Sequence, residues 1–236
     1  APSLAVTSSG EVPIDVLIAE DPVGTLGDDH ARWSGRLPFL TKVLAVDKPL
    51  SVQVHPGAAA AVAGFEREDA AGIAANAPER LFRDRSHKPE IVVAITSMTV
   101  LSGFREPQDL IADLTHIDGV DAQALIDVLA SEADAGAALA AYVRAALSLP
   151  RGCAVLDRMA ACEDDPDASE SLRVACRAMA SHPGDPGALV ALALRVANLE
   201  PGQACYTGAG VVHSYQSGVG LEVMANSDNV VRAGLT

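Results

Sequence analysis

The hydrophobic pattern of this chain changes its period twice along the sequence. Between residues 106 and 190, apolar side chains recur every three or four positions, as they do on one face of an amphipathic helix. On either side of this segment, short β-branched runs are bounded by glycine and proline, which is typical of strands and turns. We therefore predict a β-domain made of residues 1–105 and 191–236, interrupted by a helical domain over residues 106–190.

Five helices and four strands are expected from these patterns. The helices have their apolar positions within 110–114, 125–130, 137–147, 155–159 and 172–179, separated by aspartate, serine and Pro–Gly sites. The strands are expected over 49–56, 90–95, 208–215 and 220–226. Short strands with such turns favour an antiparallel sandwich or barrel, so we expect a mainly β fold with mixed α and β structure overall.

The composition excludes several classes of protein. A formal charge of −14 argues against a nucleic acid or an anionic membrane surface as the main partner. No apolar run reaches the ~18 residues of a membrane span. Residues 1–10 lack the basic and apolar regions of a secretory signal, and none of the four cysteines forms a CxxC pair. We therefore expect a cytoplasmic protein with reduced thiols.

Two short motifs carry candidate metal ligands. Gln53 and His55 lie two residues apart on an expected strand and so project from one face, although such a face is also common at a solvent-exposed surface. Lys88 and Glu90 likewise share a face after Pro89, which fits the first residue of a strand. A carboxylate there can complete a metal site, and the alternative is a surface ion pair.

The C-terminal region adds further candidates. His213 and Tyr215 share one face of a glycine-rich strand, where a histidine can equally be a core residue. Glu222 follows on the next expected strand, and Asp228 and Arg232 form an acid–base pair that is either structural or functional. Together Gln53, His55, Glu90 and His213 offer two nitrogens and two oxygens, a set that suits zinc or a similar divalent ion. With one anionic ligand, such a site would favour an anionic substrate or an enediolate-like intermediate.

Five strings in this sequence, taken together, resemble the type I phosphomannose isomerases. They cover residues 37–44, 48–56, 87–90, 208–215 and 220–236, which read LPFLTKVL, KPLSVQVHP, HKPE, GAGVVHSY and GLEVMANSDNVVRAGLT. The strings QVHP and SDNVVRAGLT are highly specific, and the helical segment falls where the family carries one. The resemblance also indicates that this chain begins inside the first β-region of the family and stops before its second cupin domain, so we expect part of a longer protein.

The resemblance implies a cupin-type jelly roll with an inserted α-helical domain. It implies a monomeric enzyme that interconverts mannose 6-phosphate and fructose 6-phosphate, a small phosphorylated sugar substrate, and a place in mannose and GDP-mannose metabolism. It implies one Zn²⁺ per chain on the same four ligands, Gln53, His55, Glu90 and His213. The implied catalytic residues are Arg232, Lys88 and Glu222, and the implied substrate-binding residues are Ser51, Tyr215, Asp228 and Lys42.

The expected chemistry moves a proton between C2 and C1 of the sugar through a cis-enediol. Zinc would polarise substrate oxygens, and Lys88 or Glu222 would transfer the proton, the sequence leaving open which is the base. Arg232 would neutralise phosphate or enediolate charge, and Ser51 would donate a hydrogen bond to the phosphate. Two alternatives remain: another metal-dependent cupin enzyme, such as an iron oxygenase, and a non-catalytic sugar-binding cupin.

Overall fold

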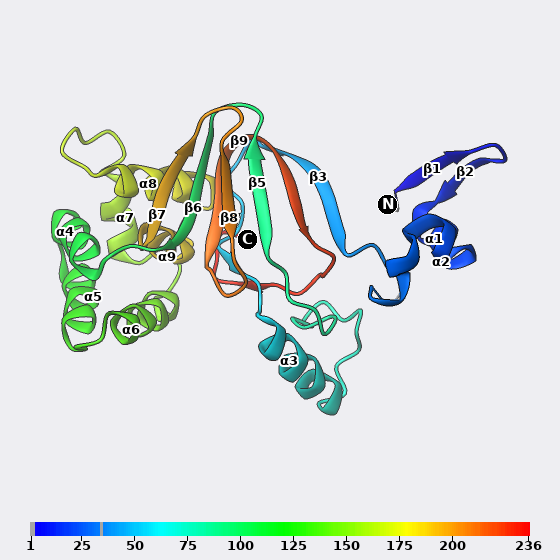
Figure 1. The fold of residues 1–236 in the computed structure, drawn as a ribbon. Coiled ribbons are helices and arrows are strands. Elements are labelled where there is room, and N and C mark those ends of the chain that lie inside the picture. The colour runs from blue at the N-terminus through cyan, green and yellow to red at the C-terminus, as the bar shows by residue number, and fades with distance from the viewer. Residues whose placement is uncertain (1–2, 34) are drawn as a thin grey trace.

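The protein combines helices with antiparallel sheet (Figure 1). The computed structural model describes residues 3–33 and 35–236. A two-stranded sheet lies near the N-terminus, and a sheet of eight strands forms the centre of the molecule. None of the helices in these described ranges combines the length and the apolar character that crossing a membrane requires.

The five helices expected in the central segment are confirmed, and a sixth follows them. They are α4 (Pro107–Ile117), α5 (Val120–Ala130), α6 (Ala135–Ser148), α7 (Ala154–Ala160), α8 (Glu170–Ser181) and α9 (Gly187–Leu192). Local signals set several of their starts. Pro107 occupies the first turn of α4, and the side chains of Asp134 and Ser169 accept hydrogen bonds from backbone N–H groups at the starts of α6 and α8.

The strands are all paired antiparallel. They are β1 (Leu4–Thr7), β2 (Gly10–Pro13), β3 (Phe39–Val46), β4 (Gln53–Val54), β5 (Glu90–Ala94), β6 (Met98–Phe104), β7 (Leu194–Leu199), β8 (Ala204–Thr207), β9 (His213–Ala225) and β10 (Val231–Arg232). The long strand β9 is the centre of the large sheet, because its first half pairs with β4 and β6 and its second half with β3 and β5.

Three strand predictions were wrong in their limits. In the run 49–56 only Gln53 and Val54 form a strand, and Pro49 and Pro56 at its ends have no N–H to donate. The N–H groups of Leu50 and Val52 still donate to the carbonyls of Tyr215 and Gly234. Residues 208–212 form a turn, and the expected strands 208–215 and 220–226 are one strand, β9. Gly218 lies inside this strand at φ 103°, where a Cβ would come within 2.5 Å of the carbonyl oxygen of Ser97. Glycine there permits the change of pairing partners rather than ending the strand.

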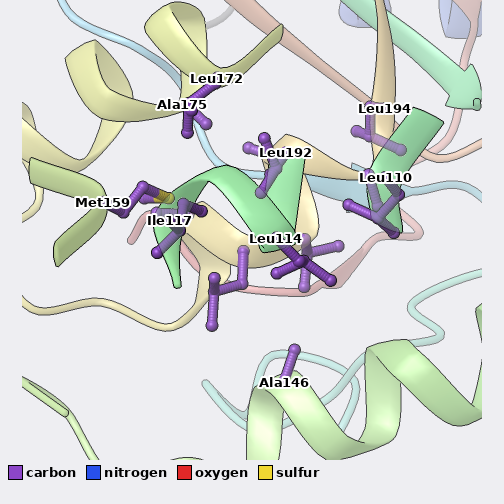
Figure 2. Packing of buried hydrophobic residues seen from close by; sticks show 14 of the residues in the cluster. Leu110, Leu114, Ile117, Ala146, Met159, Leu172, Ala175, Leu192 and Leu194 are labelled. Carbon is purple, nitrogen blue, oxygen red and sulfur yellow. The ribbon is translucent and has the colours of Figure 1, made fainter. Parts of the chain in front are cut away.

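The helices α4–α9 pack against one side of the large sheet (Figure 1). Figure 2 shows Leu110, Leu114 and Ile117 of α4 facing side chains from α6, α7, α8 and the start of β7. The same buried cluster includes Val52, next to the candidate ligand Gln53, and Leu235 at the C-terminal end. This shared core fixes the segments that carry the site, while the division into 1–105 plus 191–236 and 106–190 stays a prediction.

The remaining helical elements were not anticipated from the sequence. They are α1 (Ile14–Glu20), α2 (Pro22–Leu26), the 3₁₀ helix at Asp28–Ala31 and α3 (Ala58–Ala70). In Figure 1, β1, β2, α1 and α2 lie beyond β3, on the side away from α4–α9. The helix α3 follows β4 directly and leads into the loop before β5, so it links the two motifs that contribute His55 and Glu90.

Candidate metal centre and active site

Three candidate ligands from distant parts of the sequence meet in the interior. His55 follows β4, Glu90 begins β5 and His213 begins β9, and at most 2% of each residue is exposed. Nε2 of His213 lies 2.7 Å from Oε1 of Glu90, and Nε2 of His55 lies 3.3 Å from Oε2. One ligand atom from each of the three residues lies within 4.8 Å of the other two. These residues are close enough to share one metal ion.

Strand register explains how the sequence brings these groups together. In the ladder, Gln53 of β4 stands opposite His213 of β9 on one side and Arg232 of β10 on the other. Directly opposed residues of antiparallel strands project from the same face. Three site candidates separated by up to 179 positions therefore form one row across three neighbouring strands. The side-chain amide of Gln53 lies 3.3 Å from Nε2 of His213, at the edge of the His–Glu–His group.

The donor set fits a divalent metal. Nδ1 of His55 donates to the carbonyl of Asn229 at 2.7 Å, and Nδ1 of His213 donates to the carbonyl of Val211 at 3.0 Å. Since each Nδ1 is occupied, each Nε2 is free to act as a ligand. Oε2 of Glu90 is buried without a hydrogen-bond partner in the described residues. Burial would raise the pKa of Glu90, but the contacts with His213 and His55 outweigh it and hold this pKa below its usual range. A buried, ionised carboxylate with a free oxygen is what a cation would satisfy.

Lys88 lies against this group. Its Nζ is 3.4 Å from Nε2 of His55 and 3.8 Å from Oε2 of Glu90, and its side chain is 12% exposed. Burial lowers the pKa of Lys88, and the charge of Lys42 adds to this effect, while Glu90 opposes it. An amine with a lowered pKa is suited to moving protons.

Lys42 and Glu222 form an ion pair across the strands β3 and β9. The two residues are directly opposed in the register, and Nζ of Lys42 lies 3.1 Å from Oε2 of Glu222. Glu222 is buried and Lys42 is half exposed. The pair holds a carboxylate and an ammonium at the edge of the same site.

A cavity of about 350 Å³ joins most of the predicted site residues. Its wall includes Lys42, Ser51, Gln53, His55, Lys88, Glu222, Asp228 and Arg232, together with Leu50 and Val230. Three predicted residues, Glu90, His213 and Tyr215, are not part of this wall. Tyr215 is buried, and its hydroxyl donates to Oε1 of Glu90 at 3.1 Å. The structure thus places the Tyr215 hydroxyl on a candidate ligand and not on the cavity.

Arg232 and Asp228 are both exposed and both face the cavity. Among the described residues, no ion pair joins them, and Arg232 has no carboxylate partner within salt-bridge distance. Arg232 is therefore a cation facing the cavity, available to an anionic ligand.

Sequence reasoning missed two residues beside the site, Asp84 and Asn229. Both are engaged in a network of hydrogen bonds behind His55 and Lys88. The sequence did contain a signal for Asn229, because this residue lies in the family-specific string SDNVVRAGLT. The string pointed to the family rather than to any contact of Asn229, since a hydrogen-bond partner more than 140 positions away leaves no local pattern.

The fold and the buried His–Glu–His group define a helix-and-sheet protein with a candidate metal centre beside a cavity that bears cationic side chains. Residues 6–107 match the catalytic domain of type I phosphomannose isomerase. The mannose-6-phosphate isomerase of Salmonella typhimurium is 36% identical over 250 residues, an alignment that covers 99% of this chain and 60% of the relative. The mouse (Mus musculus) mannose-6-phosphate isomerase is 32% identical, with 93% and 53% covered.

A solved structure of the Salmonella typhimurium enzyme, bound to its substrate and to zinc, superposes with a TM-score of 0.85. The two chains are 35% identical, and the match covers 98% of this chain and 58% of that one. Over residues 6–107 the chain is similar to the type I phosphomannose isomerase family, and it spans about 60% of the length of the Salmonella relative.

Proposed function

We propose that this chain carries the catalytic site of a mannose-6-phosphate isomerase, which interconverts mannose 6-phosphate and fructose 6-phosphate. The observation that carries the proposal is the buried group of His55, Glu90 and His213 beside a cavity with three cationic side chains. Cations collected at one cavity of an acidic protein are suited to a phosphorylated ligand. The names of the relatives and the substrate-bound neighbour support the same substrate class.

We propose one zinc ion per chain, held by Gln53, His55, Glu90 and His213. When bound, zinc would supply Lewis-acid polarisation of substrate oxygens. Two imidazole nitrogens, one carboxylate and one amide oxygen are a donor set that zinc accepts. Glu90 is the one anionic member, so the centre keeps net positive charge toward an anionic intermediate.

Different residues of this chain would transfer the proton and neutralise the negative charge of the substrate. Lys88 and Glu222 are the groups that take a proton from C2 and return it to C1, because one has a lowered pKa and the other is a buried carboxylate on the cavity wall. Arg232 holds the phosphate or the charge of the enediolate with its planar fork of donors. Ser51, Lys42 and Asp228 contact the substrate from the same wall. The substrate contact expected of Tyr215 stays a prediction.

The proposal also covers the fold type, the cellular location, the oligomeric state and the metabolic role. We propose that the curled antiparallel sheet is a cupin-type jelly roll. The protein would act as a cytoplasmic monomer in mannose and GDP-mannose metabolism, with a small sugar phosphate, and neither nucleic acid nor a membrane, as its partner. The formal charge of −14 supports the exclusion of nucleic acid.

The test is an isomerase assay on metal-free and metal-restored protein. The chelator-treated chain should lose the interconversion of the two sugar phosphates, and zinc should restore it. Full activity in metal-free protein would contradict the metal requirement. Recovery with iron and consumption of oxygen would favour a cupin oxygenase, and sugar binding without turnover would favour a non-catalytic cupin. Gln53 beside the His–Glu–His group makes the isomerase the better-supported alternative.

A further inference from the structure

Asn229 is a buried polar residue that the proposed chemistry does not use. It is completely inaccessible to solvent, although its neighbour Asp228 is exposed. Its Oδ1 accepts hydrogen bonds from the backbone N–H groups of Arg83 at 2.6 Å and Asp84 at 3.1 Å. Its Nδ2 donates to the carbonyls of Asp84 at 2.8 Å and Ser86 at 2.9 Å. Every hydrogen-bonding position of this amide is therefore filled by one loop, residues 83–86.

The side chain of Asp84 completes the connection from the other direction. Its carboxylate accepts from the hydroxyl of Ser227 at 3.0 Å and from the backbone N–H of Asp228 at 3.1 Å. The Ser227 hydroxyl in turn accepts from the backbone N–H of Asn229 at 3.2 Å. We call this set, Asp84, Ser86, Ser227 and Asn229, the 84–229 clasp. The clasp joins the loop 83–86 to the loop 227–229 by hydrogen bonds in which side chains of both loops take part.

Both loops of the clasp lead directly into the candidate site. The loop 83–86 precedes Lys88 by two residues and Glu90 by four, and the loop 227–229 contains Asp228 and precedes Arg232. A third element is attached as well, because the carbonyl of Asn229 accepts the hydrogen bond from Nδ1 of His55 at 2.7 Å. Asn229 is therefore hydrogen-bonded to the loop before Lys88 and to the candidate ligand His55, and it lies three residues before Arg232.

We propose that Asn229 is a positioning residue for the zinc centre, an inference that rests on the proposed function. Its side chain fixes the two loops relative to each other, and its carbonyl holds His55 as the Nδ1–H tautomer with Nε2 toward Glu90. Asn229 does not line the cavity and touches no reacting group. It acts through His55, as partners beyond the immediate ligands do in metal sites.

The chemistry of the amide explains why asparagine occupies this position. The loop 83–86 presents two N–H donors and two carbonyl acceptors to one side chain, and a short amide matches both kinds at once. An aspartate of the same shape would keep the two accepted hydrogen bonds. It would also turn a carboxylate oxygen toward two carbonyls and the carboxylate of Asp84, which lies 3.2 Å from Nδ2. Asn229→Asp therefore opens the clasp without changing side-chain volume.

The experiment compares Asn229→Asp with Asn226→Asp in the whole 236-residue chain. Asn226 lies on the same segment, is exposed and takes no part in the clasp, so its variant adds the same charge without opening it. Zinc affinity is measured by competition with a chromophoric chelator. The tautomer of His55 is read from the ¹⁵N shifts of its imidazole in metal-free protein.

Asn229→Asp should weaken zinc binding roughly 10-fold to 100-fold, the usual effect of removing a partner behind a metal ligand. His55 should lose its single Nδ1–H tautomer, and Asn226→Asp should resemble wild type in both measurements. If Asn229→Asp does not fold, Ser227→Ala decides, since it removes one hydroxyl of the clasp and should shift both readouts in the same direction by less.

Wild-type zinc affinity and an unchanged His55 tautomer in a folded clasp variant would overturn the inference while leaving the proposed function intact. A wild-type chain that binds no zinc would overturn the proposed function and this inference together. A loss of thermal stability with both readouts unchanged would show that the clasp is structural only, which also contradicts the inference.

Discussion

The hydroxyl of Tyr215 and the carboxylate of Glu90 are joined by a buried hydrogen bond of 3.1 Å. The acceptor is Oε1, the same oxygen that lies 2.7 Å from Nε2 of His213. The Tyr215 hydroxyl therefore fixes Oε1 beside His213, while Oε2 has no hydrogen bond in the described structure. This arrangement orients the free oxygen of a candidate ligand before any metal binds.

Tyr215→Phe should weaken zinc binding roughly 10-fold to 100-fold, because the ring stays in the core and only the hydrogen bond to Glu90 is lost. The matched control is Tyr142→Phe, which removes another buried hydroxyl, one that donates to the carbonyl of Leu189 away from the site. That control should lower the free energy of unfolding by about 1 kcal/mol and leave zinc affinity unchanged. Equal zinc affinities for wild type and Tyr215→Phe would remove this role from Tyr215.

Lys88→Met should slow proton transfer and stabilise the metal-free fold at neutral pH. Burial lowers the pKa of Lys88 below 10.5, so the unfolded chain binds this proton more tightly than the folded chain. The stability of wild type relative to Lys88→Met should therefore rise with pH between the lowered pKa and 10.5. Isomerase activity should fall by about 10²–10⁴.

Thermal melts of metal-free wild type and Lys88→Met, taken across this pH range, measure the predicted difference. Melting temperatures that differ by a constant amount at every pH would contradict a lowered pKa. Lys88→Met with near wild-type turnover would exclude Lys88 as a proton-transfer group and leave Glu222.

Arg232→Ala should keep its fold and its zinc while losing about 10²–10³ in turnover, the usual cost of one well-placed charge donor. Arg232→Lys should recover part of this, since an ammonium keeps the charge but lacks the planar fork. Melting temperature, zinc content and kcat should be measured on one preparation. A variant that is destabilised yet fully active per folded molecule would show that Arg232 serves the fold.

The features that could be predicted from the sequence are those that depend on residues close together in the chain. The helices α4–α8 were found because their 3.6-residue period and their caps, such as Ser169 before α8, lie within a few residues of one another. The ligand candidates were found because residue type and spacing already suggest coordination, and the structure brought Glu90, His55 and His213 together.

The contacts that sequence reasoning missed are long-range. Two separate strands were expected over 208–215 and 220–226, although Gly218 lies inside the single strand β9 and allows it to pass close to Ser97. Tyr215 and Glu90 are 125 positions apart in the sequence, and Asn229 and His55 are 174 positions apart. Each contact depends on how distant segments pair in the fold. No periodicity or motif in a single sequence records such pairings.

The most direct test of the central claim is a zinc titration of metal-free protein in which isomerase activity and bound zinc are measured on the same samples. Activity should rise in proportion to bound zinc and level off at one ion per chain. His213→Ala, which removes one of the four proposed ligands, should bind zinc weakly and stay inactive across the same range. Activity that does not depend on bound zinc, or full activity in His213→Ala, would contradict the assignment of the His55–Glu90–His213 group as the catalytic zinc centre.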